Sequence, residues 1–518
     1  MTNVLLVNPP EKTDITRVLD LRAPPMGLMY LAATLEEAGL PVEILDANLF
    51  DMTMPQIERE IGRRSPDFIG VTCTTATVKN GMRIVMRARR AVPDIVTALG
   101  GVHPTFLPAR TLQECPHLDM VVVGEGEVTI VELSKALDGF RWGDNNRYKD
   151  GKAREFVDRL SKVNGLALRN PDDPYNAEKV KLTPPRPYIK DLDTIPFPAR
   201  HLVPFDRYRI LGKTTAVGTI ITSRGCPYAC GYCSSTRIAG IRFRARSPKN
   251  VMEEIVLLHD KYRLDSVEFI DDIFTLNQKR AMEFCDMVRD YGLNIEWVAS
   301  SRVNTVSREL MSAMAKVGLR TMYFGVESGT QNVLDLMGKA ARLQQAIDSF
   351  KIAHEMGVEP MGAFILGYPG ETLDEMEETI NFAIKLEPDY AQFSVLTPYP
   401  GTPVYDELKS KGLLLTEDWD KYTVLEPVVK YEAFGYTNKD VRNKLKRAYY
   451  RFYFRPSYLR RHAHVIPVAI SEERCLRLCG VPPRITTPIT RDWKAWLEIC
   501  LKRETCGLAE PARALNAL

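Results

Sequence analysis

Hydrophobic positions in the first 145 residues form short runs that alternate with amphipathic stretches. Each apolar run is only a few residues long, which suits a strand that is buried on both faces of a parallel sheet. The amphipathic stretches between these runs, such as residues 27–38 and 79–91, predict helices that cover the sheet. The alternation therefore predicts a doubly wound α/β domain, Rossmann-like (flavodoxin-like), with ligands at the carboxyl ends of its strands. The predicted strands are residues 4–7, 42–45, 68–72, 95–99 and 120–123.

A second region of alternating strand and helix signals covers residues 211–410. Helices fit between its predicted strands, for example at residues 248–262 and 278–291. A series of βα units of this length favours a partial (β/α)6 TIM barrel over another open sheet. The predicted strands are residues 217–223, 266–270, 296–300, 321–326, 362–365 and 390–396.

The segments outside these two regions differ from them in composition and in expected structure. Residues 146–210 contain many prolines and charges, which predicts a linker with some local strands that wraps one domain onto the next. Residues 411–518 are expected to form a mainly helical C-terminal domain. The predicted organisation is therefore an α/β domain at residues 1–145, the linker, a barrel at residues 211–410 and a helical domain.

The composition excludes some classes of function. The 518 residues include 69 Lys and Arg against 66 Asp and Glu, so the formal net charge is only +3. This balance does not indicate a nucleic acid or an anionic membrane as a partner. No apolar run reaches the roughly 18 residues that cross a bilayer, and no export signal is apparent. We therefore expect a cytoplasmic protein with no membrane span and no nucleic acid, and a monomer by default.

Three cysteines lie close together after the first predicted barrel strand. Cys226, Cys230 and Cys233 have three and then two residues between them. Thiolates at this spacing can bind three irons of one [4Fe–4S] cube and leave the fourth iron open to a small chelating ligand. The alternative is a structural zinc loop, but such sites use four ligands and no further Cys or His follows nearby. The spacing favours an iron–sulfur cluster.

This loop resembles the cluster loop of the radical S-adenosylmethionine (SAM) superfamily, both in spacing and in its place after the first barrel strand. The resemblance implies that SAM binds the open iron, and that an external low-potential electron donor reduces the cluster to release a 5′-deoxyadenosyl radical. An acidic residue or an Arg at a strand end is, by itself, equally often a helix cap or a surface ion pair. The implied SAM contacts are Tyr232, Glu268, Arg302, Glu327, Ser328 and Gly367.

The domain order resembles the cobalamin-binding subfamily of these enzymes. Matches include Asn-Pro-Pro at residues 8–10 and Gly-Gly-Val-His-Pro at residues 100–104, and they continue to Pro403. The Asp-x-His-x-x-Gly motif, whose His binds cobalt in other cobalamin enzymes, is absent, so the lower axial ligand stays open. The alternative is a flavodoxin-like domain that binds a nucleotide, a flavin or nothing. The implied cobalamin contacts are Pro10, Met26, Gly27, Leu28, Thr74, Thr75, Gly100, Gly101, Val102, His103, Gly124 and Glu125.

The reaction that the resemblance implies is methylation of an unactivated carbon, with methylcobalamin as methyl donor and one SAM as radical source. The substrate stays open between a protein or peptide side chain and a small molecule such as a lipid or tetrapyrrole. Length and domain order suggest the glutamine C-methyltransferase of methyl-coenzyme M reductase without singling it out. The alternatives are a radical SAM cyclase or C–C bond-forming enzyme, and a cobalamin-binding sensor with a degenerate barrel.

Four further cysteines form two pairs near the end of the chain: Cys475 with Cys479, and Cys500 with Cys506. Together they can form a second metal site for zinc, iron or another iron–sulfur cluster. Their spacings differ from the usual Cys-x2-Cys, and cysteines are also common as small buried apolar residues. A second metal site, with a structural or electron-relay role, is a hypothesis that the sequence leaves open.

Overall fold

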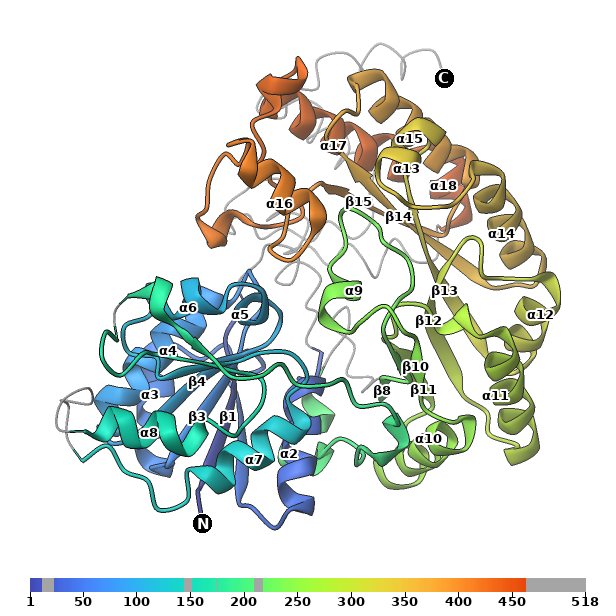
Figure 1. Ribbon diagram of the computed structural model, residues 1–518. Helices are drawn as coiled ribbons and strands as arrows, with labels where there is room; N and C mark the ends of the chain where they lie inside the picture. The colour runs from blue at the N-terminus through green and yellow to red at the C-terminus, as the bar shows by residue number, and fades with distance from the viewer. Residues whose placement is uncertain (12–22, 144–150, 175, 209–217, 463–518) are drawn as a thin grey trace, which may run out of the picture. The chain divides into compact units, whose positions relative to one another are not determined.

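Figure 1 shows the computed structural model, which describes residues 1–11, 23–143, 151–174, 176–208 and 218–462. The chain divides into two compact units, Met1–Tyr450 and Arg451–Leu518. The first unit contains both predicted α/β regions. Among the described residues, no helix combines the length and the apolar character that a membrane span needs. The cysteines of the hypothetical second metal site, Cys475, Cys479, Cys500 and Cys506, lie outside the described residues.

The N-terminal sheet has the predicted doubly wound topology. Its parallel strands are β1 (Val4–Asn8), β2 (Val42–Asp46), β3 (Phe68–Thr72), β4 (Val96–Gly100) and β5 (Met120–Val122). The spatial order of these strands is β2-β1-β3-β4-β5. Because β1 lies between β2 and β3, the direction of the crossovers reverses there. Ligands of open α/β sheets bind at the carboxyl ends of the strands beside such a reversal.

Helices cover both faces of this sheet, as Figure 1 shows. They are α2 (Met26–Glu37), α3 (Met54–Arg64), α4 (Val78–Ala91), α5 (Val102–Phe106), α6 (Pro108–Glu114) and α7 (Glu127–Ala136). Leu5 and Val7 pack in the core that includes α3 and α4, whereas Val4 and Leu6 pack in the core that includes α2 and α7. Both faces of the strands are therefore apolar, which explains the continuous apolar runs in the sequence.

Two more strands extend this sheet into the segment predicted as a linker. β6 (Leu166–Leu168) pairs antiparallel with β5, and β7 (Lys181–Leu182) pairs antiparallel with β6. Helix α8 (Lys152–Leu160) precedes them and buries its apolar side chains in the core of α2 and α7. The first sheet thus continues past residue 145. The sequence did not predict that these strands join the sheet, because strands this short leave no periodic signal. The 3-10 turns η1 (Ala177–Lys179), η2 (Leu192–Thr194), η3 (Arg200–Leu202) and η4 (Phe205–Arg207) accompany these strands.

The second α/β region forms the predicted partial barrel. Its parallel strands, neighbours in chain order, are β8 (Gly218–Ile220), β11 (Ser266–Phe269), β12 (Glu296–Arg302), β13 (Leu319–Glu327), β14 (Glu359–Leu366) and β15 (Tyr390–Val395). Helices line the outer side of these strands (Figure 1). They are α10 (Pro248–Tyr262), α11 (Gln278–Tyr291), α12 (Arg308–Lys316), α13 (Gln331–Leu336), α14 (Leu343–Glu355) and α15 (Leu373–Leu386), with the 3-10 turn η5 (Phe274–Leu276) before α11.

Residues along the barrel strands alternate between a packed outer face and a more open inner face. On β11, Val267 and Phe269 are buried, whereas Glu268 between them is partly exposed. The ring of Phe269 meets those of Trp297 and Phe284 at centroid distances of 5.4 Å, so the outer face packs beneath α11. The inner face therefore stays accessible beside the carboxyl ends of the strands, where barrels of this kind place their active sites.

After the barrel the chain packs against the N-terminal sheet again. Helix α16 (Pro403–Ser410) leads into residues 413–429, which we call the return segment. Trp419 and Tyr422 of this segment lie in the same buried cluster as Leu5 and Val71. The return segment is therefore part of the N-terminal core. The elements that complete the described chain are η6 (Trp419–Lys421), η7 (Tyr431–Phe434), α17 (Asn438–Tyr453) and α18 (Pro456–Arg461).

Candidate active site

The predicted cluster loop, residues 226–233, lies between β9 (Ser223–Arg224) and α9 (Ser235–Ile238). The amide of Cys226 donates to the carbonyl of Gly240 at 3.2 Å. In the middle of the loop, the amide of Gly231 donates to the carbonyl of Met337 at 2.8 Å. The loop is thus fixed by backbone bonds to segments from other parts of the barrel.

The sulfur atoms of this loop receive hydrogen bonds. Arg302 Nη1 donates to Cys230 Sγ at 3.4 Å, and the amide of Ser235 lies 3.4 Å from Cys233 Sγ. Cys226 and Cys230 are buried and Cys233 is partly exposed. Burial raises the pKa of the Cys226 and Cys233 thiols, so their deprotonation is coupled to metal binding. Donors that point at sulfur stabilise the thiolate and tune the potential of a bound cluster.

A buried ion pair lies beside the cluster loop. Lys339 Nζ is 2.6 Å from Glu327 Oε1 and donates to the Tyr232 hydroxyl at 3.2 Å. The side chains of Lys339 and Glu327 are only 4% and 9% exposed. Glu327 has a φ of +71°, which is rare for a residue with a side chain and indicates local strain. The sequence predicted Glu327 and Tyr232 but missed Lys339, because a lysine after a short helix forms no recognisable motif.

Arg302 lies at the end of β12, as predicted, but its guanidinium is already engaged. Besides its bond to Cys230, it donates to the carbonyl of Lys339, and its Nε is 3.3 Å from Asn304 Oδ1. Its Cζ atom lies 3.7 Å from the centre of the Tyr228 ring. These contacts associate Arg302 with the cluster loop, and the expected bond to a SAM carboxylate would compete with them.

The other predicted SAM contacts have different surroundings. Ser328 is buried, and its hydroxyl lies 3.2 Å from that of Thr379 in α15, so it faces an outer helix. A Cβ on Gly367 would lie only 2.6 Å from the hydroxyl of Tyr431, so this glycine permits a close backbone approach. Glu268 is partly exposed on the inner face of the barrel. Of these residues, Glu268 has the placement that best suits a ligand contact.

The carboxyl edge of the first sheet has open space at several predicted cobalamin contacts. A Cβ on Gly27 or Gly124 would have no atom within 4 Å. Thr74 is exposed, and Val102 is 40% exposed. Small and hydroxyl-bearing residues at such an edge allow the backbone to approach a broad ligand. The predicted contacts Pro10 and Gly100 lie at the ends of β1 and β4 on this same edge.

His103 is buried below this edge. Its Nδ1 lies 3.2 Å from Thr75 Oγ1, and its ring meets that of Trp419 edge-on at 4.8 Å. Its Nε2 has no hydrogen-bond partner among the described residues. Burial lowers the pKa of the imidazole to about 4, with a smaller contribution from Arg110, so the ring is neutral at pH 7. The sequence identified His103 and Thr75 but not Trp419, which comes from the distant return segment.

Three predicted cobalamin contacts have side chains that are buried or already paired with another residue. Met26 and Leu28 are buried, and Leu28 belongs to the core between the sheet and α2. The carboxylate of Glu125 binds the guanidinium of Arg244, with Nη2 at 2.7 Å from Oε1. These residues shape the edge of the sheet, while Gly27 and Gly124 beside them leave it open.

Comparisons with known proteins identify both domains. The family model described as B12 binding domain matches residues 12–134, and that of the Radical SAM superfamily matches residues 220–383. An uncharacterized methyltransferase of Pyrococcus horikoshii is 40% identical over 456 residues, which cover 88% of this chain and 93% of that protein. The chain belongs to the cobalamin-dependent radical SAM methyltransferases. The cofactors of this enzyme are accordingly a [4Fe–4S] cluster, SAM and cobalamin.

Two further known proteins are similar to this radical SAM methyltransferase, one in sequence and one in fold. The anaerobic magnesium-protoporphyrin IX monomethyl ester cyclase of Rubrivivax gelatinosus is 30% identical, over 84% of this chain and 75% of the cyclase. The structure of the radical SAM methyltransferase TsrM from Kitasatospora setae, solved with cobalamin and a [4Fe–4S] cluster, superposes with a TM-score of 0.63. It is 19% identical and covers 86% of this chain and 82% of TsrM, so it shows that the folds agree.

The side chains of the methyltransferase fit these cofactors. Cys226, Cys230 and Cys233 are all free thiols on one fixed loop. Within the described ranges, no three His, Cys, Asp or Glu side chains converge closely enough to hold a single metal ion. Three thiolates that bind separate irons of a cube do not need to converge on one point. At the other domain, open space at Gly27 and Gly124 suits the approach of a broad ligand such as cobalamin.

We call the carboxyl edge of the first sheet the cobalamin edge, after the contacts predicted there, and we predict that Gly101→Ala destabilises it. Gly101 has a φ of +101°, and a Cβ there would lie 2.7 Å from the carbonyl oxygen of Cys73. We expect the free energy of unfolding, measured with urea, to fall by about 2 kcal/mol because the added Cβ is strained and crowded. Gly62→Ala is the matched control. Gly62 lies within helix α3 with its nearest neighbour at 3.7 Å, so we expect a gain of about 0.5 kcal/mol. Equal stability of the two variants would contradict this prediction.

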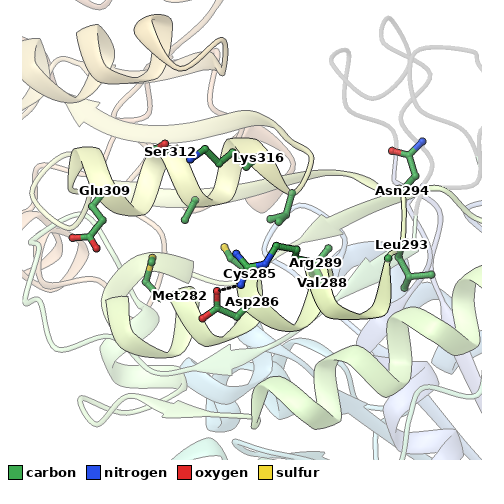
Figure 2. A pocket seen from close by; sticks show the side chains of 13 residues that line it. Met282, Cys285, Asp286, Val288, Arg289, Leu293, Asn294, Glu309, Ser312 and Lys316 are labelled. Atoms are coloured by element: carbon green, nitrogen blue, oxygen red, sulfur yellow. Dashed lines mark hydrogen bonds and ion pairs between the residues drawn. The ribbon is translucent and has the colours of Figure 1, made fainter.

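A groove of about 520 Å³ on the outer side of the barrel lies apart from this site. It runs between α11 and α12, and Figure 2 shows Asp286, Arg289, Glu309 and Lys316 among the side chains that line it. Arg289 is paired with Asp286 at 2.6 Å. Because α11 and α12 cover the outer face of the strands, the groove does not contribute to the cluster loop.

Proposed function

We propose that this enzyme transfers a methyl group to an unactivated carbon of its substrate, and that a protein or peptide side chain is the substrate class to test first. The observation that carries the methyl transfer is the 40% identity to a methyltransferase over 88% of the chain. The choice of a protein or peptide side chain rests on the sequence resemblance and not on the similarity to these relatives. A cytoplasmic location, a monomeric state and an external low-potential electron donor also stay predictions.

When bound, the cluster and SAM supply a 5′-deoxyadenosyl radical, and cobalamin supplies the methyl group. The protein itself provides binding and orientation. Lys339 is suited to contact the carboxylate of SAM, and Glu327 to accept a hydrogen bond from its amino group. The bond from Arg302 to Cys230 Sγ adds positive charge beside the cluster. Hydrogen abstraction depends on positioning rather than on a general base, so we assign none.

The products of SAM test the proposed reaction. We expect the reconstituted enzyme, given dithionite and its substrate, to form S-adenosylhomocysteine and 5′-deoxyadenosine in comparable amounts, as measured by liquid chromatography and mass spectrometry. The similarity to the Rubrivivax gelatinosus cyclase makes a ring-forming reaction the second candidate. A cyclase would form 5′-deoxyadenosine without S-adenosylhomocysteine. A cobalamin-binding sensor with a degenerate barrel would form neither, and both of these outcomes would contradict methyl transfer.

The substrate class requires a separate measurement. Cell extract from a strain that lacks the enzyme can be incubated with the enzyme and SAM that carries a deuterated methyl group. We expect a peptide fraction to gain one labelled methyl on carbon. Label in a lipid or tetrapyrrole fraction instead would overturn the peptide proposal while it supported methyl transfer. The glutamine of methyl-coenzyme M reductase is one candidate site to examine in the peptide fraction.

A further inference from the structure

Four charged side chains join the cobalamin edge to the strand that leads into the cluster loop. We call Glu125, Glu127, Arg224 and Arg244 the clamp. Arg244 binds Glu125 with both terminal nitrogens, at 2.7 and 3.1 Å. Arg224 forms ion pairs with Glu127 and with Glu125, the latter at 3.3 Å. Two arginines from the barrel thus hold two carboxylates from the first domain.

Both ends of the clamp are adjacent to cofactor loops. Glu125 follows Gly124 in the loop after β5 at the predicted cobalamin edge, and Glu127 begins helix α7. Arg224 is two residues before Cys226. It also pairs across the short antiparallel strands β9 and β10 (Arg244–Ala245), where Arg224 lies opposite Arg244. Both arginines are therefore fixed to the same two-stranded element.

The connection from Arg224 to Cys226 is closely packed and hydrogen-bonded. Gly225, the residue between them, packs so closely that a Cβ would lie 2.3 Å from the carbonyl oxygen of Arg242. The amide of Cys226 in turn donates to the carbonyl of Gly240. A displacement of Arg224 or Arg244 would therefore be passed to the first ligand of the cluster rather than absorbed by a flexible loop.

The clamp is shielded from solvent, and Glu125 and Arg244 make several hydrogen bonds each. The side chains of Glu125, Glu127 and Arg244 are less than a tenth exposed. Glu125 also accepts a bond from the amide of Ile189 at 2.9 Å, and Arg244 donates to the carbonyl of Ala239 at 2.8 Å. Buried pairs of this kind contribute little net stability, but their bidentate geometry selects one relative arrangement.

We propose that the clamp sets the position of Cys226, and with it the cluster, relative to the cobalamin edge. Arg224 and Arg244 are positioning residues, and Glu125 acts through them rather than as a direct cobalamin contact. This inference rests on the proposed function, in which radical, substrate carbon and methyl donor must lie within a few ångströms. A small error in the relative position of the two cofactors would then lower methyl transfer without preventing either cofactor from binding.

A second ionic contact of the first domain, which does not involve the barrel strands, supplies a control. Lys79 of α4 binds Asp418 and Asp420 of the return segment, the latter at 3.1 Å. These side chains are more exposed than those of the clamp, at 33% for Lys79 and 55% for Asp420. The contact does not adjoin the cluster loop in the sequence. Asp418→Asn with Asp420→Asn therefore weakens an ionic contact within the N-terminal core that involves neither β9, β10 nor the cluster loop.

The test uses the full chain reconstituted with iron, sulfide and cob(II)alamin, without substrate. Glu125→Gln and Arg244→Gln remove one clamp partner each and keep side-chain size or polarity. We expect both variants to bind iron and cobalamin with wild-type stoichiometry and cobalamin affinity. We expect the dipolar broadening of the cob(II)alamin EPR signal by the reduced cluster to change equally in both, and to stay unchanged in the Asp418 and Asp420 variant. Unchanged broadening in both clamp variants would overturn the inference.

Other outcomes separate the clamp from the proposed function. Loss of cobalamin affinity in Glu125→Gln but not in Arg244→Gln would show that Glu125 binds the cofactor directly, against the inference. If the variants do not accept cofactors, hydrogen exchange of the apoprotein is the second measurement: faster exchange at residues 224–233 than in the control supports the clamp, and equal exchange opposes it. A wild-type protein that bound neither a cluster nor cobalamin would instead overturn the proposed function.

Discussion

Replacement of Cys226, Cys230 and Cys233 by alanine is expected to abolish both the [4Fe–4S] cluster and the cleavage of SAM. These thiols are the predicted cluster ligands on one fixed loop, and no other side chain adjoins them in a set that could hold a metal ion within the described ranges. Without the cluster, no electron reaches the sulfonium of SAM. The measurements are iron and sulfide content, the EPR signal after reduction, and 5′-deoxyadenosine formed with dithionite, which should fall to background.

The control for this prediction is another buried cysteine in the barrel. Cys285 is 2% exposed on α11, and it lines the outer groove rather than the cluster loop. We expect Cys285→Ala to keep the full iron content and the full rate of SAM cleavage. Its cost in stability should be about 1 kcal/mol, as for the loss of a small buried apolar group. A triple variant that kept its cluster would show that the ligands lie elsewhere.

Lys339→Met is expected to cause the largest loss of stability from a single substitution at the site. Removal of the lysine leaves the Glu327 carboxylate buried without its ion-pair partner at 2.6 Å. Breaking a buried pair from one side typically costs about 3–5 kcal/mol, because an uncompensated charge stays inside the protein. Urea unfolding followed by circular dichroism measures the change, and SAM affinity should fall as well because both proposed SAM contacts are disturbed.

A second substitution and an exposed lysine make this prediction specific. Lys339→Met combined with Glu327→Gln removes both charges, so we expect it to recover most of the lost stability but not SAM binding. Lys351 on α14 is 71% exposed and lies 4.0 Å from Glu355. We expect Lys351→Met to change stability by less than about 0.5 kcal/mol, as for other exposed pairs. Equal effects at Lys339 and Lys351 would contradict the importance of the buried pair.

Local patterns predicted most of the elements that carry the site. The helices expected at residues 248–262 and 278–291 are α10 and α11, and each expected barrel strand is present. Such elements depend on the spacing of apolar residues along one segment, which the sequence displays directly. The spacing of Cys226, Cys230 and Cys233 is local in the same sense, because one loop brings the three thiols together.

The sequence by itself determined the two α/β domains, their order and the cysteine loop, since each of these follows from residues that are near one another in the chain. Only the tertiary structure decided which distant residues complete the site. It paired β6 and β7 with the first sheet, and it formed the ion pairs of Lys339 with Glu327 and of Arg244 with Glu125. It also brought the Trp419 ring against His103. These contacts join segments far apart in the sequence, and their formation depends on packing and burial that no local pattern records.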